Sequence, residues 1–241
     1  VDDNKNNILK YMEEASNNDV DLIVFPECSL TGYVFESPED FAKIDYISVA
    51  DALNAISKEA ENLSINVVFG TLEIIDGVWV NSCYLIDKYG RCERQVKNHL
   101  PKIGADRFVR EGDAAARVFQ IGDFRVGIII CYEARFPEIS RSLALEGVDI
   151  LLHPTNLPIS SKKIVDFILP VRAMENKVYV ISSNRTGEEN GVKFLGRSTI
   201  FDLNGDVLAE ADQLSSGLIY ANLSIEAVRN KTLNFSASAP H

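Results

Sequence analysis

The spacing of apolar and polar residues along the chain predicts a succession of helices and strands. Apolar positions recur with helical periodicity in four segments, residues 4–16, 50–62, 137–147 and 162–176. Short runs that are rich in β-branched and other apolar residues, and that end in turn residues, predict strands. These runs are residues 20–25, 65–70, 71–75, 78–86, 91–96, 118–121, 124–130, 149–153, 178–183, 198–203, 207–211 and 218–223.

Several of the predicted strands are joined by tight turns. Asp76-Gly77, Gly122-Asp123 and Asn204-Gly205 are the turn signals of hairpins. Because helices alternate with strands while other strands meet through hairpins, we predict an α/β fold with mixed sheets that carry helices on an outer face only. Pro170 either kinks the helix that contains it or marks its true start. No linker divides the chain, so residues 1–241 are predicted to form a single domain.

The net charge and the lengths of the apolar runs exclude some classes of protein. The chain has 24 Lys and Arg against 35 Asp and Glu residues, which gives a net charge of −11. Such a balance argues against non-specific binding to nucleic acid or to an anionic membrane. No apolar run approaches the roughly 18 residues of a membrane-spanning helix, and no secretory signal is recognised. We therefore expect a cytoplasmic protein.

The cysteines and histidines lack the spacing of a metal site. No two cysteines form a close C-x-x-C pair, and only three histidines are present, so a zinc site is not predicted. In a reducing cytoplasm the thiols are expected to stay free. The residues concerned are Cys28, Cys83, Cys92, Cys131, His99, His153 and His241.

The apolar run that ends at Cys131 has the chemistry of a candidate site. A buried strand stops at the cysteine, and Pro137 suits the first turn of the helix that follows. Sites in α/β sheets are often built at this end of a strand. A buried core cysteine explains the residue equally well.

Glu27 and Lys97 stand at the ends of two other predicted strands, so three reactive side chains can meet at one edge. A thiol needs a base or a cationic neighbour to become a nucleophile. Glu27 can take the thiol proton and return it to a leaving amine. Lys97 and the backbone N–H of Tyr132 can stabilise the oxyanion of a tetrahedral intermediate. Taken singly, a solvated lysine and a turn glutamate explain Lys97 and Glu27 just as well.

Six motifs together resemble the nitrilase superfamily of carbon–nitrogen hydrolases. They occur in the family's order and spacing from about Asp19 to Leu223, which is nearly the whole chain. The motifs are Pro26-Glu27 followed by Gly32-Tyr33, Lys97-x-His99-Leu100-Pro101, Cys131-Tyr132-Glu133-Ala134-Arg135-Phe136-Pro137-Glu138, Arg172-Ala173-Met174-Glu175-Asn176, Asn184-Arg185-x-Gly187 and Gly196-Arg197-Ser198.

The resemblance implies a four-layer α-β-β-α sandwich that assembles as a homodimer or a larger homo-oligomer. It implies that Cys131 is the nucleophile, Glu27 the general base and Lys97 the oxyanion residue, with no metal or organic cofactor. Specificity would come from Tyr33, from the segment after Cys131 and from the end of the strand near residue 155. The substrate-binding residues implied in this way are Tyr33, Tyr132, Glu133, Arg135, Thr155 and Asn156.

The chain departs from the family pattern in two respects. Many members have a second glutamate shortly after the lysine, and here Asp106 and Glu111 are the candidates for this fourth acid, although neither aligns cleanly. The chain also opens on a helix where the family has a β-strand, and it ends where relatives continue. We therefore expect that it lacks the family's first β-strand and C-terminal tail.

The predicted activity is hydrolysis of a non-peptide C–N bond in a small linear amide or N-carbamoyl compound. Amides are preferred to nitriles because Tyr132 stands where nitrilases proper commonly have tryptophan. The alternatives are a glutamine-hydrolysing module that supplies ammonia, and a catalytically idle binding or scaffold protein. A papain-like pairing of Cys131 with His99 or His153 is a further alternative.

Overall fold

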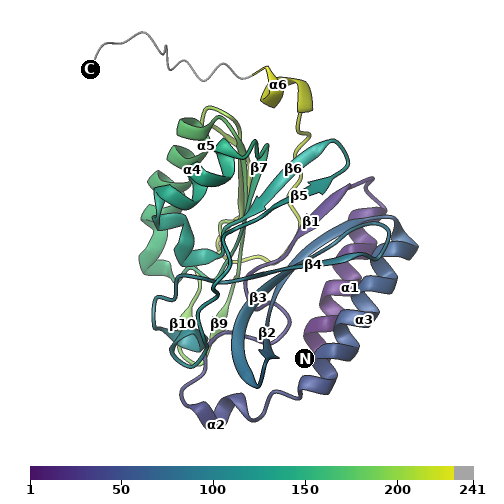
Figure 1. Cartoon of the computed structure of the whole chain (residues 1–241), viewed down its shortest axis with the longest axis vertical. Helices are drawn as coiled ribbons and strands as arrows, with labels where there is room; N and C mark the ends of the chain where they lie inside the picture. The colour runs from purple at the N-terminus through teal and green to yellow at the C-terminus, as the bar shows by residue number, and fades with distance from the viewer. Residues whose placement is uncertain (231–241) are drawn as a thin grey trace.

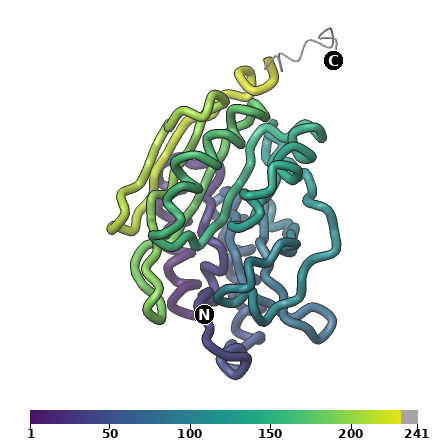
Figure 2. The backbone as a smooth tube through the Cα atoms, turned by 90° about the vertical axis from the view of Figure 1, so that its left-hand side faces the viewer, coloured from purple at the N-terminus to yellow at the C-terminus, as the bar shows by residue number. Residues whose placement is uncertain are grey.

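Figure 1 shows the computed structural model of the protein, in which residues 1–230 are described. Two β-sheets lie face to face, and a pair of helices covers the outer face of each sheet. The first half of the chain, in purple and blue, forms one side of this sandwich. The second half, from teal to yellow, forms the other and lies in front in Figure 2. The four predicted layers, α-β-β-α, are confirmed.

The first sheet has four strands and is built from the first half of the chain. In their order across the sheet they are β1 (Leu22–Val24), β2 (Asn66–Ile75), β3 (Val78–Ile86) and β4 (Cys92–Val96). β1 is parallel to β2, and the other pairs are antiparallel. The predicted runs 65–70 and 71–75 thus form one strand. Asp76 and Gly77 both have positive φ, as a two-residue turn between twisted strands requires.

The second sheet has six strands and is mixed, as predicted. In their order across the sheet they are β12 (Val207–Glu210), β11 (Thr199–Phe201), β8 (Tyr179–Asn184), β7 (Ile150–Thr155), β6 (Phe124–Ile128) and β5 (Val118–Ile121). β6, β7 and β8 are mutually parallel, and the outer pairs are antiparallel. The carboxyl ends of β6 and β7 therefore meet at the same edge.

The helices cover the sheets because each presents an apolar stripe at helical spacing. On the first sheet lie α1 (Asp2–Ser16) and α3 (Tyr46–Leu63), and on the second lie α4 (Pro137–Leu145) and α5 (Leu169–Asn176). The stripes of α1 and α3 pack on the outward side chains of β2 and β3. Their buried members are Ile8, Met12, Ala15, Val49, Ala52, Ile56 and Ala60.

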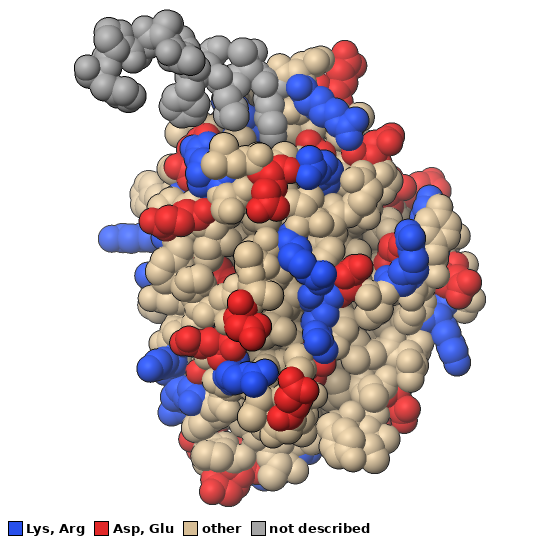
Figure 3. Space-filling model, in the orientation of Figure 1, with Lys and Arg blue, Asp and Glu red and all other residues tan. Residues whose placement is uncertain are grey.

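One face of the molecule is mixed in charge. Acidic and basic side chains are interspersed on the face in Figure 3. No helix among residues 1–230 is both long enough and apolar enough to cross a membrane.

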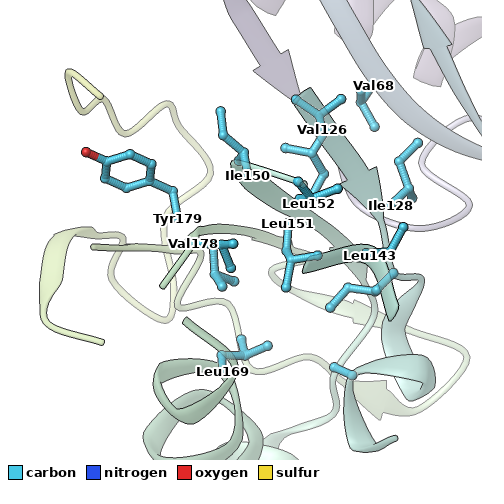
Figure 4. Packing of buried hydrophobic residues seen from close by; sticks show 14 of the residues in the cluster. Val68, Val126, Ile128, Leu143, Ile150, Leu151, Leu152, Leu169, Val178 and Tyr179 are labelled. Carbon is cyan, nitrogen blue, oxygen red and sulfur yellow. The ribbon is translucent and has the colours of Figure 1, made fainter. Parts of the chain in front are cut away.

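The main core fills the space between the two sheets and continues under α4 and α5. Val68 of β2 points at the second sheet, where Val126 and Leu152 lie near it (Figure 4). On the other side of that sheet, Leu151 is fully buried, as are Leu143 of α4 and Leu169 of α5 to within 1%. Burying one such leucine contributes about 1.5–3 kcal/mol of stabilisation.

Short elements connect the layers. They are α2 (Pro38–Phe41), β9 (Glu188–Glu189), β10 (Val192–Lys193), α6 (Ile225–Arg229), the 3-10 turns η1 (Gly104–Arg107), η2 (Cys131–Arg135) and η3 (Ile159–Ser161), and the π-helical turn η4 (Ile164–Ile168). The helix predicted over residues 162–176 is formed, because the α-helical residues 162–163, the π-helical η4 and α5 follow one another without a break. Pro170 is preceded by helical residues, so it does not mark the start of the helix. It lies directly after the π-helical turn, where a proline interrupts the regular α-helical hydrogen bonds.

One predicted strand is wrong. Residues 218–223 have the apolar composition of a strand but form none, and their backbone makes no hydrogen bond to the described part of the chain. A strand requires a partner that completes its backbone hydrogen bonds. These residues instead line a groove of about 720 Å³ together with Val20–Val24 and the turn near Gly122. Apolar periodicity does not reveal whether a partner strand exists.

Candidate active site

Cys131 lies just beyond the carboxyl end of β6, in the first residue of η2. The ladder continues to Ile129, whose N–H donates to the Leu152 carbonyl at 2.9 Å. Cys131 then adopts φ +49°, the left-handed region that non-glycine residues rarely occupy. Such backbone strain is concentrated at functional sites. The Cys131 side chain is 8% exposed, so its thiol is largely buried at the edge of the core.

Glu27 follows β1 and is held by both sheets. The Pro26 carbonyl accepts the Gly70 N–H from β2 at 3.2 Å. From the second sheet, the Asn156 side chain donates to the Glu27 carbonyl at 2.8 Å. The Glu27 side chain is 1% exposed, and its Oε2 has no partner among the described residues. One carboxylate oxygen is thus left available in a buried space.

Lys97 stands where β4 ends, and its side chain is fully buried. Its N–H donates to the Asn81 carbonyl at 2.9 Å, which fixes it to β3. Its Nζ lies 2.7 Å from Glu27 Oε1 and 2.5 Å from Asp106 Oδ2. A buried ammonium group is tolerated only with such partners.

Asp106 and Glu111 were the two candidates for a fourth acid, and the structure separates them. Asp106, in η1, is buried beside Lys97, whereas Glu111 is exposed. The Tyr33 hydroxyl lies 3.0 Å from Asp106 Oδ2. Gly104 permits this, because a Cβ on that residue would stand 2.5 Å from the Tyr33 ring.

Asn81 completes the cluster and was not foreseen from the sequence. Its Nδ2 donates to Glu27 Oε1 and to Asp106 Oδ1, both at 2.9 Å. Its Oδ1 accepts the weak hydrogen bond of the Cys28 thiol at 3.5 Å. The available signal was a polar residue in β3 that lies on the same face of the strand as the inward-facing Cys83 and Leu85.

Burial and charge set the protonation of the three reactive groups. Burial raises the pKa of Glu27, as does the Asp106 charge, while Lys97 opposes the rise. Burial alone would lower the pKa of Lys97, but the adjacent Glu27 and Asp106 carboxylates hold it well above its ordinary value. Burial and the Glu27 charge raise the pKa of Cys131 to about 12, against the opposing effect of Lys97. At rest the Cys131 thiol is therefore protonated. It lies within the electrostatic field of the Glu27 carboxylate and the Lys97 ammonium group.

The residues after Cys131 differ in placement. Glu133 was expected to contact substrate, but its two oxygens accept the backbone N–H groups of Asn98 and Ile130, at 2.8 and 2.7 Å. It thereby ties the Lys97 segment to the Cys131 segment. Arg135 is exposed, with its guanidinium 5.5 Å from the centre of the half-buried Tyr132 ring.

The end of β7 lies against Cys131, as the resemblance implied. The Thr155 side chain and the Asn156 backbone both lower the pKa of the Cys131 thiol, which places them beside the sulfur. Asn156 Oδ1 is buried and has no partner within residues 1–230. This oxygen and Glu27 Oε2 are two free acceptors in the same region.

Neither histidine is paired with the thiol. His99 is partly exposed, and its Nδ1 lies 3.7 Å from Glu133 Oε1. His153 is fully buried, and its Nε2 lies 3.0 Å from the backbone carbonyl of Cys131. A papain-like dyad is therefore not assembled. No group of three or more His, Cys, Asp or Glu side chains in the described part of the chain is placed to hold a metal ion.

Comparison with known proteins identifies the class. An amidase from Nesterenkonia sp. superposes with a TM-score of 0.86 at 24% identity, over 95% of this chain and 87% of that one, so the fold is that of the nitrilase-superfamily amidases. A nitrilase of Pyrococcus abyssi is 35% identical over 97% of this chain and 88% of its own length. A 2-oxoglutaramate amidase of Bacillus subtilis is 27% identical over 90% of this chain and 83% of its own.

The model of the carbon–nitrogen hydrolase family matches residues 1–231. The chain belongs to this family, and it is an enzyme of that class.

Proposed function

We propose that the protein hydrolyses a small linear amide or N-carbamoyl compound through a thioester on Cys131. The observation that supports this most directly is the buried cluster of Glu27, Lys97 and Asp106, in which the charges of Glu27 and Lys97 act on the Cys131 thiol. A base with a raised pKa and a fixed ammonium group beside a nucleophile are the parts that acyl transfer needs.

In the first half-reaction, the Cys131 sulfur attacks the substrate carbonyl carbon while Glu27 takes the thiol proton. The carbonyl π pair moves to oxygen, where the Lys97 ammonium and the Tyr132 N–H stabilise the negative charge. When the intermediate collapses, the C–N bond breaks and Glu27 returns the proton to nitrogen. Ammonia or an amine leaves, and the acyl group remains on sulfur.

In the second half-reaction, a water molecule gives a proton to Glu27 and attacks the thioester carbon. The C–S bond breaks, and the carboxylic acid is released. The sulfur regains its proton from Glu27, which restores the resting state. Asp106 and Asn81 touch no reacting atom in this scheme; they hold the Lys97 ammonium and the Glu27 carboxylate in place.

The substrate is a small amide rather than a peptide, because Cys131 and Glu27 are both more than 90% buried. Tyr33, Tyr132, Thr155 and Asn156 remain the proposed contacts for it. Glu133 and Arg135 are no longer favoured, because the first is saturated by backbone groups and the second is exposed.

The proposal includes a homodimer that forms through the outer face of α5. Phe167 of η4 and Val171 and Met174 of α5 repeat at helical spacing along this face and its continuation into η4, and they are 62%, 39% and 48% exposed. Apolar stripes of this kind mark protein contacts. Light scattering behind gel filtration should give twice the monomer mass for the wild type and the monomer mass for Met174→Glu. A monomeric wild type would contradict the dimer.

The activity is tested by ammonia release from small aliphatic amides, N-carbamoyl amino acids, nitriles, glutamine and 2-oxoglutaramate, the last because of the named relative. Wild type is compared with Cys131→Ala. Release from an amide or carbamoyl compound that is lost in Cys131→Ala is the expected result. Release that persists in the variant would refute the nucleophile, and no release at all would favour the scaffold alternative.

A further inference from the structure

His153 is the one fully buried histidine of the described chain, and the scheme above does not use it. It lies in β7, next to the strand that leads to Cys131, and opposite Ser182 of β8 in the sheet register. Its Nε2 is 3.0 Å from the Cys131 carbonyl oxygen, and its Nδ1 is 2.9 Å from the Ser182 hydroxyl. Both ring nitrogens are therefore engaged, one of them by the backbone of the nucleophile itself.

The chemistry of the two partners fixes the tautomer. A carbonyl oxygen only accepts, so the proton must be on Nε2, which donates to Cys131. Nδ1 then has a lone pair, and the Ser182 hydroxyl donates to it. Burial lowers the pKa of His153 to about 4, with a further lowering by the Lys97 charge, so the ring is neutral at neutral pH. Ser182, His153 and the Cys131 carbonyl thus form a directed chain of hydrogen bonds.

The Cys131 carbonyl belongs to the same peptide unit as the Tyr132 N–H. A peptide unit is planar, and in the trans form its C=O and N–H point in opposite directions. Holding the carbonyl therefore fixes the direction of the N–H. This control is needed here, because Cys131 is in the strained left-handed region and is no longer held by the β6 ladder.

The Tyr132 N–H has no acceptor within residues 1–230. Backbone N–H groups away from water are nearly always paired, so a free one beside a nucleophile indicates a ligand atom as its partner. A hydrogen bond to the carbonyl end of an amide also polarises it and makes its N–H a better donor.

We propose that His153 is a positioning residue that aims the Tyr132 N–H at the oxyanion of the acyl-transfer intermediates, with the Cys131 carbonyl setting the tautomer and the Ser182 hydroxyl holding Nδ1. This inference rests on the proposed function, because it assigns a role within the same half-reactions. His153 does not exchange protons with Cys131 Sγ or with substrate.

The test separates oxyanion stabilisation from thiol reactivity. Alkylation of Cys131 by iodoacetamide forms a C–S bond at a saturated carbon, releases iodide and generates no oxyanion. Propionaldehyde adds reversibly: the S–C bond forms, the C=O π bond breaks, and the thiol proton ends on the oxygen that the Tyr132 N–H would hold. Its affinity is read as protection of Cys131 against iodoacetamide, which requires no turnover.

The variants are His153→Leu, His153→Gln and Ser182→Ala, with Leu151→Ala as a control. Leu151 is a fully buried residue of the same strand that packs only in the core, so this variant reports general destabilisation. For His153→Leu we expect kcat on the amide found above to fall roughly 10- to 100-fold, since loss of an oxyanion donor costs about 100- to 1,000-fold. KM and the alkylation rate should change less than threefold, and propionaldehyde affinity should fall in parallel with kcat.

His153→Gln places an N–H near the position of Nε2 and should recover most of the lost kcat, and Ser182→Ala should give an intermediate loss. Leu151→Ala should keep kcat within threefold of wild type. If His153→Leu does not fold, the Gln and Ser182 variants decide the matter by the same readouts.

The proposal is overturned if propionaldehyde affinity is unchanged in the His153 and Ser182 variants, or if alkylation falls as much as kcat. A wild type that hydrolyses no amide would contradict the proposed function alone. In that case the aldehyde protection experiment still decides the role of His153.

Discussion

Asn81→Leu is the substitution that most directly probes how the buried charges are held. The side chains are similar in volume, but leucine has no donor for Glu27 Oε1 or Asp106 Oδ1, each now 2.9 Å from Asn81 Nδ2. A hydrogen bond to a charged group contributes about 1.5–3 kcal/mol. Loss of both, partly offset by the more apolar side chain, should lower the free energy of unfolding by about 3–5 kcal/mol.

This loss is a large part of the 5–15 kcal/mol that usually stabilises a domain, yet it should leave the variant folded at 25 °C. A domain of this size loses roughly 2–4 °C of Tm per kcal/mol, so the melting temperature should fall by roughly 6–20 °C. Urea denaturation with wild-type m-values would give the free energy, and a thermal melt would check it.

The same substitution should change the activity in a specific direction. The Asn81 donor lowers the pKa of Glu27, so its removal must raise that pKa further. The acid limb of the kcat/KM profile should therefore move to higher pH.

Asn66→Leu is the matched control. Asn66 is also buried, but its partners are the Asp21 carbonyl at 2.7 Å and the Lys88 N–H at 3.1 Å, which are neutral. Asn66→Leu should lower the free energy of unfolding less than Asn81→Leu does, and it should leave the acid limb of the kcat/KM profile unmoved. The reasoning fails if the two variants lose equal stability and neither shifts the profile.

Three further outcomes are expected. The pKa of His153 is lowered from 6.5 to about 4, so between these pH values the unfolded chain binds a proton that the folded chain does not. The free energy of unfolding should therefore fall by up to about 3 kcal/mol as the pH drops from 6.5 to 4. Urea titrations should show this slope in wild type and not in His153→Gln, and equal slopes would contradict it. The Glu189 carboxylate accepts the backbone N–H groups of Tyr33 and Val34 at 3.2 and 3.0 Å. Glu189→Ala should therefore lower kcat/KM roughly tenfold and speed proteolysis of the loop that contains Tyr33 and Val34. Unchanged proteolysis would show that this loop is ordered without Glu189. Because the pKa of Cys131 is raised to about 12, its iodoacetamide labelling should rise about tenfold per pH unit from pH 8 to 10, and a plateau in that range would refute a protonated resting thiol.

The layers of the fold were predictable because apolar periodicity reports which face of an element is buried. The stripe of α3 and the continuous run of β2 both follow from that rule. Residues 218–223 satisfy the same rule without forming a strand, because pairing depends on what lies beside them in space. The single-domain assignment, the oligomeric state and the cytoplasmic location remain predictions.

The three strand-end residues of the site were predictable from their motifs, and the groups that support them were not. Asn81 lies inside a strand, in no motif, and its use is visible only when Glu27 and Asp106 are brought to it from 54 and 25 residues away. The choice between Asp106 and Glu111 likewise depends on how the η1 turn folds against Tyr33. Glu133 follows Cys131 closely in sequence, yet its carboxylate oxygens are occupied by backbone N–H groups.

The cluster contains two carboxyl groups and one ammonium group, so with both acids ionised it has one uncompensated negative charge. Burial makes that charge unfavourable, which is why the pKa of Glu27 is raised while Lys97 and Asn81 limit the rise. A general base is most effective when its pKa lies close to the working pH. Without the second acid, a single carboxylate paired with Lys97 would be a weaker base. Without Lys97 and Asn81, a buried carboxyl group would stay protonated. In the proposed mechanism, the second acid and the two donors therefore set the strength of Glu27 as the base for Cys131.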